Sequence, residues 1–338
     1  MSDTVAIVGA GAWGTALAVH LAGVAEPPAL RLCGRDPAAA RAMAASRENS
    51  RYLPGIALPP EIDVVSEPTA AIAGASLIIV ATPVGALTGV AQALRSHTKA
   101  PLVWLGKGFV AAAEPPGVAL AHRIIAPMWP SPVGVISGPS FAEEVARGLP
   151  TAISVAATEP GLAQSIARRL RGGTLRAYVS DDLTGIEVGG AVKNILAIAA
   201  GASDGLGFGY NARAALITRG LAETARLAVA LGGRRETLTG LSGLGDLVLT
   251  CTGDLSRNRR VGIELGKGRS LVDILSHMRM VAEGVRTTGA ALALGARHGV
   301  ELPLAAQMSA VLEGRTTARE AVETLMLRPQ RPEADRPS

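Results

Sequence analysis

The sequence contains very few aromatic residues and only two cysteines. Phe, Trp and Tyr make up 3% of its 338 residues, although hydrophobic residues make up 48%. The apolar content is therefore mainly Ala, Val and Leu, a composition that is typical of helices and buried parallel strands and not of a β-sandwich or a disordered chain. Cys33 and Cys251 lack the spacing of metal ligands. We expect both to be reduced thiols in a cytoplasmic protein.

Histidine is also scarce, and its distribution indicates no metal site. The five histidines show no paired spacing, and His20 and His122 lie in ordinary helical stretches. We therefore expect neither a bound metal nor histidine-based catalysis.

The sequence also predicts no segment that would direct the protein to a membrane. No basic segment precedes the first apolar stretch, so we expect no signal peptide. Residues 76–94 carry no charge, but Thr82, Pro83 and Gly85 interrupt them. Those residues favour a strand, a turn and a helix start over a transmembrane helix. We expect no integral membrane association.

Positive charge is present without the pattern that nucleic-acid binding requires. The net charge is +5 and the pI is about 9.7. The basic residues are scattered, and no aromatic residues are interleaved with them. This balance favours an enzyme for small anionic molecules, and we expect no nucleic-acid partner.

The first half of the sequence alternates short apolar runs with Ala-rich helical stretches. This alternation predicts a parallel sheet covered by helices. From about residue 186 the pattern is almost entirely helical, and the stretch 214–231 ends at Gly232 and Gly233 as at a helix C-cap. We predict two domains, 1–183 and 184–328, followed by a disordered tail at 329–338. The expected strands are 5–8, 30–33, 77–80, 102–105, 133–136 and 151–156, and expected helices include 15–21, 37–45, 84–94 and 161–170.

A glycine-rich turn follows the first apolar run and precedes a helix. In the segment GAGAWG, Gly9 permits a tight turn, Gly11 lets the backbone approach a pyrophosphate, and Gly14 lets the helix pack closely on the strand. The helix N-terminus attracts the anion. This context predicts dinucleotide binding, and the alternative is a tight turn without a ligand.

The end of the second expected strand bears on the choice of dinucleotide. A site selective for NAD usually has an acid there to bind the ribose 2′-hydroxyl. Here Gly34 and Arg35 follow the strand. Arg35 would suit the 2′-phosphate of NADP or stack on adenine, so we favour NADPH and keep NAD open. The alternative is a surface arginine without a ligand.

Lysine is rare in a sequence that otherwise uses arginine for positive charge. Only four of the 33 basic residues are lysines. A lysine can lose its proton near neutral pH when its pKa is depressed, whereas an arginine effectively cannot. Lys107 follows an expected strand, and Lys193 lies among small residues of an expected helix. Both are candidate catalytic residues, whereas Lys99 and Lys267 stand in polar turns.

Two polar segments in the second half are candidate ligand sites. Asp246 stands among glycines and apolar residues, and Ser256, Arg257 and Asn258 offer several donors to one phosphate. The alternative for the second segment is a solvated loop in which Ser256 caps the next helix. The segment around Gly138 and Ser140 is also compatible with a plain turn before a helix.

Read together, these motifs resemble the bacterial NAD(P)-dependent glycerol-3-phosphate dehydrogenases. The resemblance extends from Ile7 to about Arg328 and includes several specific motifs in order. It implies an α/β fold like that of 6-phosphogluconate dehydrogenase, with an N-terminal Rossmann-type doubly wound parallel sheet and a C-terminal all-helical domain. The motifs are GAGAWGTALA, NSRYLPG, KG at 107–108, SGPSFAEEVARGLPTA, AVKNILAIAAG, SGLGDLVLTCTGDLSRN and VAEGVRT.

The resemblance also implies roles for individual residues. Lys193 matches the proton acceptor, with Lys107 and Asp246 beside it. Position 12 is often serine in relatives and is alanine here, which we expect to matter little because backbone N–H groups bind the phosphates. The substrate-binding positions are Lys107, Gly138, Ser140, Lys193, Asp246, Ser256, Arg257 and Asn258. The dinucleotide-binding positions are Ala12, Trp13, Arg35, Lys107, Ala142, Arg257, Val281 and Glu283, beside Gly9, Gly11 and Gly14.

The implied reaction is a reversible hydride transfer between sn-glycerol 3-phosphate and dihydroxyacetone phosphate that supplies glycerophospholipid synthesis. One alternative is a related two-domain β-hydroxyacid or imine-type dehydrogenase, whose substrate would lack the phosphate. Another is a non-catalytic NADP(H)-sensing protein, which would need no proton acceptor. The sequence leaves the oligomeric state open, with a homodimer as one candidate.

Overall fold

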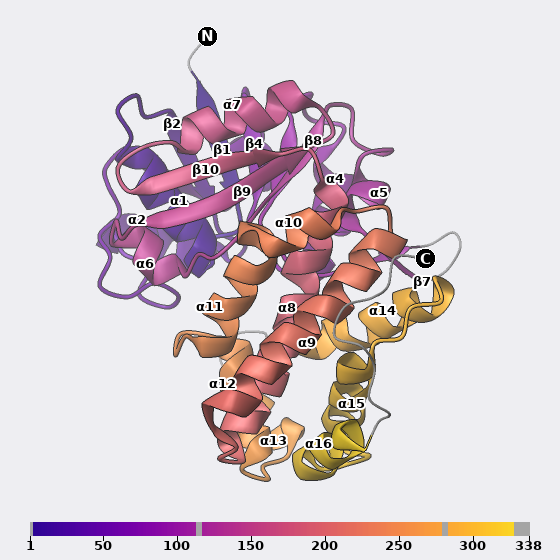
Figure 1. Ribbon diagram of the computed structural model, residues 1–338. Helices are drawn as coiled ribbons and strands as arrows, with labels where there is room; N and C mark the ends of the chain where they lie inside the picture. Colours follow the sequence, from indigo (N-terminus) through magenta and orange to yellow (C-terminus); the bar gives the residue numbers. More distant parts are fainter. Residues whose placement is uncertain (1–2, 113–116, 279–282, 328–338) are drawn as a thin grey trace.

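The computed structural model describes residues 3–112, 117–278 and 283–327. Within those ranges every strand ends by Ser180, and every element that begins at Leu183 or later is helical. Figure 1 shows the part that contains the sheet above the helical part. The tail expected at 329–338 lies outside the described residues.

A mixed eight-stranded sheet forms the core of the first half. The strands from β8 to β3 run parallel to one another, and the chain order reverses between β4 and β1. Sheets of this kind bind ligands at such a switch point, beyond the carboxyl ends of the strands. In spatial order the strands are β10 (Leu175–Ser180), β9 (Thr151–Ala157), β8 (Val133–Ser137), β5 (Leu102–Trp104), β4 (Leu77–Val80), β1 (Thr4–Val8), β2 (Ala29–Cys33) and β3 (Ile62–Val65).

The apolar runs predicted the buried strands and missed the edges of the sheet. All six expected runs form strands, and their bounds agree to within one residue. The two edge strands β3 and β10 were missed because several of their side chains are exposed, which breaks the apolar run. One pair departs from the parallel expectation, since β9 runs antiparallel to β8. An apolar run buried on both faces does not encode strand direction.

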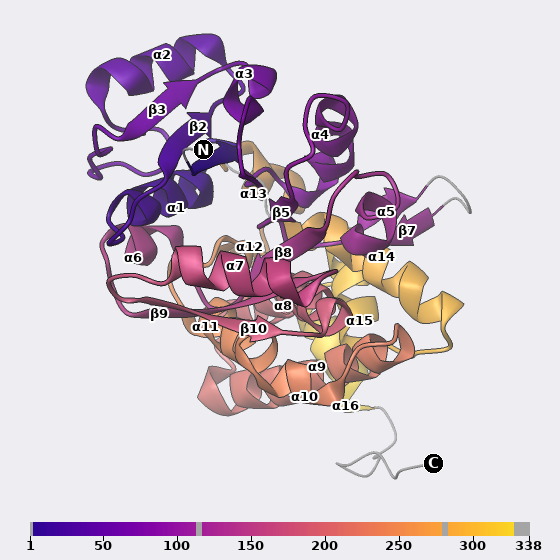
Figure 2. The ribbon, with the colours of Figure 1, turned by 90° about the horizontal axis from the view of Figure 1, so that it is seen from above.

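Helices cover both faces of the sheet (Figure 2). Several expected helices are confirmed, although α1 begins three residues before the expected 15–21 and the stretch 84–94 divides into two helices. One face packs against α1 (Ala12–Ala22), α2 (Pro37–Ser46), α6 (Ala142–Ala146) and α7 (Pro160–Leu170). The other packs against α3 (Pro68–Ile72), η1 (Val84–Ala86), α4 (Leu87–Leu94) and α5 (Ala121–Ile125). A hairpin of β6 (Val110–Ala112) and β7 (Gly117–Ala119) stands apart from the sheet.

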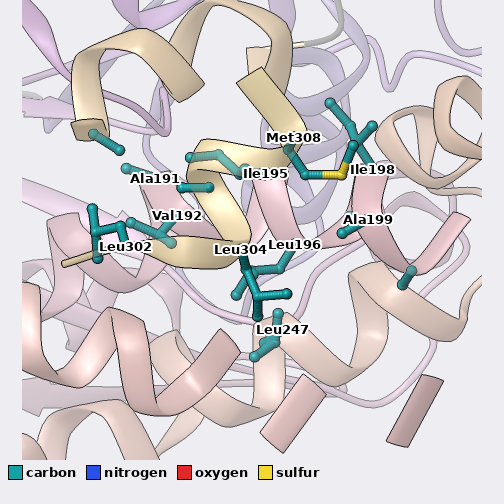
Figure 3. Close-up of a cluster of buried hydrophobic side chains, with 14 of the residues drawn as sticks. Ala191, Val192, Ile195, Leu196, Ile198, Ala199, Leu247, Leu302, Leu304 and Met308 are labelled. Carbon is teal, nitrogen blue, oxygen red and sulfur yellow. The ribbon is translucent and has the colours of Figure 1, made fainter. Parts of the chain in front are cut away.

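The second half is built around the central helix α8 (Leu183–Gly205). Among the described residues it is the one helix long and apolar enough to cross a membrane, and 94% of its apolar window is buried inside the protein. Figure 3 shows side chains of α8, including Ile195, Leu196 and Ile198, packed with Leu247, Leu302, Leu304 and Met308. Each such side chain contributes about 1.5–3 kcal/mol on burial. The helices around it are α9 (Gly209–Ala230), α10 (Arg235–Thr239), the π-helix η2 (Leu241–Gly245), α11 (Asp246–Thr252), α12 (Arg257–Gly266), α13 (Leu271–Ser276), α14 (Glu283–Arg297), α15 (Pro303–Leu312) and α16 (Ala318–Met326).

Glycines bring α8 and α12 into backbone contact. A Cβ atom on Gly201 would lie 2.0 Å from the carbonyl oxygen of Arg259, and one on Gly262 would lie 2.0 Å from that of Ile198. Neither position therefore tolerates a larger residue without separating the helices. This close crossing fixes the N-terminus of α12 next to the middle of α8.

Candidate active site

The glycine turn stands at the switch point of the sheet. Gly9 has a φ of +118°, and a Cβ atom there would lie 2.8 Å from the carbonyl carbon of Ala81. A Cβ atom on Gly14 would lie 2.0 Å from the carbonyl oxygen of Gly9. Both glycines are therefore required by the fold of the turn itself.

Gly11 differs from the other two glycines of the motif. Apart from its own chain neighbours, no atom of the described residues lies within 4 Å of where its Cβ would stand. It is the N-cap of α1 and no side chain caps the helix. The first N–H groups of α1 are thus available to an anion, and the positive end of the helix dipole attracts one. The cradle fits a dinucleotide pyrophosphate.

Trp13 ties this cradle to the loop after β8. Its indole Nε1 donates a hydrogen bond to the carbonyl oxygen of Ser140 at 2.9 Å. Ala142 begins α6 two residues later, and α6 packs against α1. The predicted residues at 13, 140 and 142 are thus brought together around the glycine turn.

Arg35 stands at the end of β2 and is exposed. The next residue, Asp36, caps α2 by accepting a hydrogen bond from the Ala38 N–H at 2.9 Å. The acid nearest the end of β2 is therefore engaged by a helix terminus, whereas the guanidinium beside it faces solvent.

A single carboxylate joins the two singled-out lysines. Lys107 Nζ donates to Asp246 Oδ2 at 2.6 Å, and Lys193 Nζ donates to Asp246 Oδ1. Lys193 Nζ also donates to Thr250 Oγ1 at 2.9 Å, and Lys107 Nζ donates to the carbonyl oxygen of Gly138 at 3.0 Å. The cluster therefore combines groups from the end of the sheet with groups from α8 and α11.

Burial changes the acid–base chemistry of this cluster. The side chain of Lys193 is 9% exposed and that of Asp246 is 1% exposed. Removal from water lowers the pKa of Lys193 to about 8, Asp246 opposes the shift, and Lys107 adds to it. A lysine with such a pKa can both accept and donate a proton near neutral pH.

Local backbone geometry positions each partner. Gly108 has a φ of +155°, and a Cβ atom there would lie 2.7 Å from Val84 Cγ1 and 3.3 Å from Thr287 Oγ1. The loop that carries Lys107 is thus held between η1 and α14. On the other side, the π-helix η2 ends immediately before Asp246. A π-turn of this kind often occurs at a functional site.

The N-terminus of α12 supplies the phosphate-binding candidates. Ser256 is buried and caps the helix by accepting a hydrogen bond from the Arg259 N–H at 3.2 Å. The alternative interpretation of this segment predicted that cap. The side chain of Asn258 is also engaged, because its Nδ2 donates to Asn194 Oδ1 at 2.9 Å and its Oδ1 accepts from the Gly284 N–H at 3.2 Å. Arg257 is the exposed member of the three.

Glu283 connects α14 to the first half of the chain. Its Oε1 accepts a hydrogen bond from the Val84 N–H at 3.3 Å. Burial raises the pKa of Glu283, an effect that Val84, Arg257 and the two lysines oppose. Partial burial likewise lowers the pKa of Arg257, and Glu283 opposes it. These effects place Arg257 near Glu283, and Glu283 near the lysine cluster, whereas Val281 lies outside the described residues.

Sequence reasoning missed two polar residues of the site. Thr250 lies one helical turn after Asp246, so the i,i+4 spacing on α11 is the signal that could have found it. Asn194 joins α8 to Asn258, and no local pattern indicates that long-range contact.

Within the described ranges, no three His, Cys, Asp or Glu side chains gather as a metal site. Cys33 and Cys251 are both buried free thiols, and burial raises the pKa of each. Neither thiol is therefore suited to act as a thiolate nucleophile near neutral pH.

Comparison with known proteins gives a consistent family signal over both halves. Residues 4–163 match the family model for the NAD-dependent glycerol-3-phosphate dehydrogenase N-terminus, and residues 182–323 match the model for its C-terminus. The glycerol-3-phosphate dehydrogenase (NAD(P)+) of Dechloromonas aromatica is 50% identical over 327 residues, covering 96% of this chain and 97% of the relative. That of Polaromonas naphthalenivorans is 49% identical and covers 98% and 99%.

Solved structures of the same family resemble this chain over nearly its whole length. The crystal structure of glycerol-3-phosphate dehydrogenase from Coxiella burnetii has a TM-score of 0.91 and 41% identity, covering 97% of this chain and 99% of that one. A ketopantoate reductase from Ralstonia eutropha has a TM-score of 0.57 at 15% identity, which is a likeness of fold alone.

Proposed function

Because the chain belongs to the family of NAD-dependent glycerol-3-phosphate dehydrogenases, we propose that it interconverts sn-glycerol 3-phosphate and dihydroxyacetone phosphate with NAD(P)(H). The observation that carries this proposal is the carboxylate of Asp246 between Lys107 and Lys193. We also propose the corresponding division of labour, with residues 1–183 binding the dinucleotide and residues 184–328 completing the substrate site.

Lys193 is the proton acceptor in this proposal. In the oxidation direction its neutral amine takes the proton of the C2 hydroxyl, and in the reduction direction its ammonium returns it. The bound nicotinamide accepts or supplies the hydride. Lys107 adds positive charge near the oxygen at C2, and Asp246 orients both ammonium groups through its two oxygens.

The start of α12 holds the substrate phosphate. The guanidinium of Arg257 can bind phosphate through two N–H groups, and the helix dipole favours the negative charge. Ser256 and Asn258 fix the helix terminus and still offer donors to the phosphate. The Ser256 hydroxyl accepts from the Arg259 N–H and keeps its own O–H, and Asn258 Nδ2 keeps a second N–H beside the one that bonds Asn194. Gly138 and Ser140 line the same substrate region from the loop after β8.

Gly9, Gly11 and Gly14 would hold the pyrophosphate of a bound dinucleotide, together with Ala12 and Trp13 in the first turn of α1. Lys107, Ala142, Arg257 and Glu283 are the other dinucleotide-binding residues of this proposal, together with Val281, which lies outside the described residues. Arg35 receives the 2′-phosphate, so NADPH is the preferred cofactor. Replacing Arg35 by Asp should raise the KM for NADPH at least about tenfold relative to NADH, because an acid repels the 2′-phosphate and accepts from a 2′-hydroxyl.

The enzyme acts in the cytoplasm, supplies glycerol 3-phosphate for glycerophospholipid synthesis, and needs no metal, nucleic acid or membrane segment. The buried free thiols support the reducing compartment. We propose a homodimer as the assembly. Tyr210 and Val229 of α9 are exposed hydrophobic side chains that a second copy could cover. Analytical ultracentrifugation tests this proposal.

The decisive assay follows the loss of NADPH absorbance with dihydroxyacetone phosphate as the only added substrate. Unphosphorylated dihydroxyacetone is the matched control, because it retains the ketone and lacks the group that α12 binds. The proposal requires turnover that depends on the phosphate. Equal activity with both ketones would instead favour a β-hydroxyacid-type dehydrogenase. Tight NADPH binding without turnover of either ketone would favour a sensor.

A further inference from the structure

A buried asparagine stands behind the glycine turn. Asn49 belongs to the motif NSRYLPG, in the loop that follows α2, and it is 3% exposed. Polar side chains at this depth are normally hydrogen-bonded, so the partners of Asn49 can be asked for. None of the roles assigned above includes this residue.

The amide of Asn49 reaches the turn directly. Its Nδ2 donates to the carbonyl oxygen of Ala10 at 3.0 Å and to Thr15 Oγ1 at 2.7 Å. Its Oδ1 accepts from the Tyr52 N–H at 3.3 Å, and its own carbonyl oxygen accepts from the Leu53 N–H at 2.8 Å. Both sides of the amide are engaged, so the loop around Tyr52 fixes its orientation.

The bond to Ala10 determines how the next peptide group lies. A trans peptide is planar, so its C=O and N–H point in opposite directions. Because Asn49 holds the Ala10 carbonyl oxygen on one side, the N–H of Gly11 is directed to the other. The position of Gly11 is the open one in the motif, with no atom within 4 Å of a Cβ placed there. The second bond, to Thr15, ties the same amide to the first turns of α1.

We propose that Asn49 is a positioning residue for the dinucleotide, and that it acts by orienting the Ala10–Gly11 peptide toward the pyrophosphate. The inference rests on the proposed dinucleotide binding at this turn. It assigns Asn49 no contact with substrate and no part in proton transfer. Its loss should therefore weaken the cofactor affinity and leave the lysine cluster unchanged.

The test compares two ligands that differ in the pyrophosphate. Adenosine diphosphate ribose 2′-phosphate contains the pyrophosphate, whereas adenosine 2′-monophosphate lacks it. Asn49→Asp keeps the size of the side chain, cannot donate to the Ala10 carbonyl, and sets an oxygen against it. Calorimetry should show the first ligand binding about tenfold more weakly to Asn49→Asp, and the second binding within about twofold of wild type.

Steady-state kinetics give an independent readout. For Asn49→Asp the KM for NADPH should rise about tenfold, while the KM for dihydroxyacetone phosphate and the kcat at saturating NADPH should change less than about threefold. Glu48→Ala is the matched control. Glu48 Oε1 accepts a hydrogen bond from the Gly55 N–H in the same loop at 2.9 Å. It should leave every one of these values near wild type.

Three outcomes separate the alternatives. Equal weakening of both ligands, or unchanged binding of both, in folded Asn49→Asp would overturn the role of Asn49. If wild type binds neither of these ligands nor adenosine diphosphate ribose, which lacks the 2′-phosphate, the dinucleotide proposal itself is wrong. Should Asn49→Asp fail to fold, Asn49→Ser replaces it in the same comparison. The serine hydroxyl is a donor but is too short to bond both the Ala10 carbonyl oxygen and Thr15 Oγ1. The ligand that contains the pyrophosphate must then again bind more weakly, and the other must not.

Discussion

The glycine turn and the lysine cluster are two halves of one site, and they are built in different ways. The turn consists of neighbouring residues whose backbone is forced by contacts such as that between Gly14 and Gly9. The cluster consists of side chains from the loop after β5, from α8 and from α11 that meet only after folding. A binding site made of backbone is local and tolerant of side-chain change, whereas an acid–base site depends on each side chain and its burial.

The largest effect is expected from a substitution that changes the lysine cluster and leaves the glycine turn intact. Lys193→Arg keeps the positive charge and removes the ability to lose a proton near neutral pH. Turnover should fall by about 10³-fold, within the range of about 10²–10⁴ that a positioned acid–base group contributes. The Kd for NADPH should stay within about threefold, as measured by fluorescence titration. Lys267→Arg, at an exposed lysine, is the control and should behave as wild type.

Two further variants of the lysine cluster should shift the pKa of Lys193 in opposite directions, with a smaller loss of turnover. Asp246 raises the pKa of Lys193 and Lys107 lowers it. Asp246→Asn should therefore move the pH dependence of glycerol 3-phosphate oxidation to lower pH, and Lys107→Met should move it to higher pH. Both variants should also lose about 10²-fold or more in kcat, because each removes a group that orients or stabilises the reacting centre. Shifts of the same sign in pH-rate profiles would refute this arrangement.

The reverse experiment changes the glycine turn and leaves the lysine cluster intact. Gly14→Ala places a methyl group where the carbonyl oxygen of Gly9 stands, so the turn must open. The Kd for NADPH should rise at least about tenfold, since the N–H groups of α1 no longer converge on the pyrophosphate. Gly11→Ala meets no atom within 4 Å and is the milder counterpart. Equal effects of the two changes on NADPH binding would contradict the distinction drawn between these glycines.

The same contrast explains what could be predicted from the sequence. β1, the glycine turn and α1 form one continuous segment, so its pattern predicted both fold and ligand. Lys107 and Lys193 could be singled out because lysine is rare in this chain. That Asp246 joins them could not be deduced from residue patterns, because Lys193 and Asp246 stand 53 positions apart. The bond between Asn194 and Asn258 was unpredictable for the same reason, whereas the direction of β9 was unpredictable because an apolar run does not encode strand direction.

The central claim is that Lys193 exchanges the catalytic proton with a pKa near 8. The direct test is the pH dependence of kcat/KM in both directions on one enzyme. Oxidation requires the neutral amine, so it should rise with pH through about 8 and level off above it. Reduction requires the ammonium, so it should be level below about 8 and decline above. Opposed limbs with a common midpoint would confirm the account, whereas profiles that change in the same direction, or show no transition between pH 7 and 9, would contradict it.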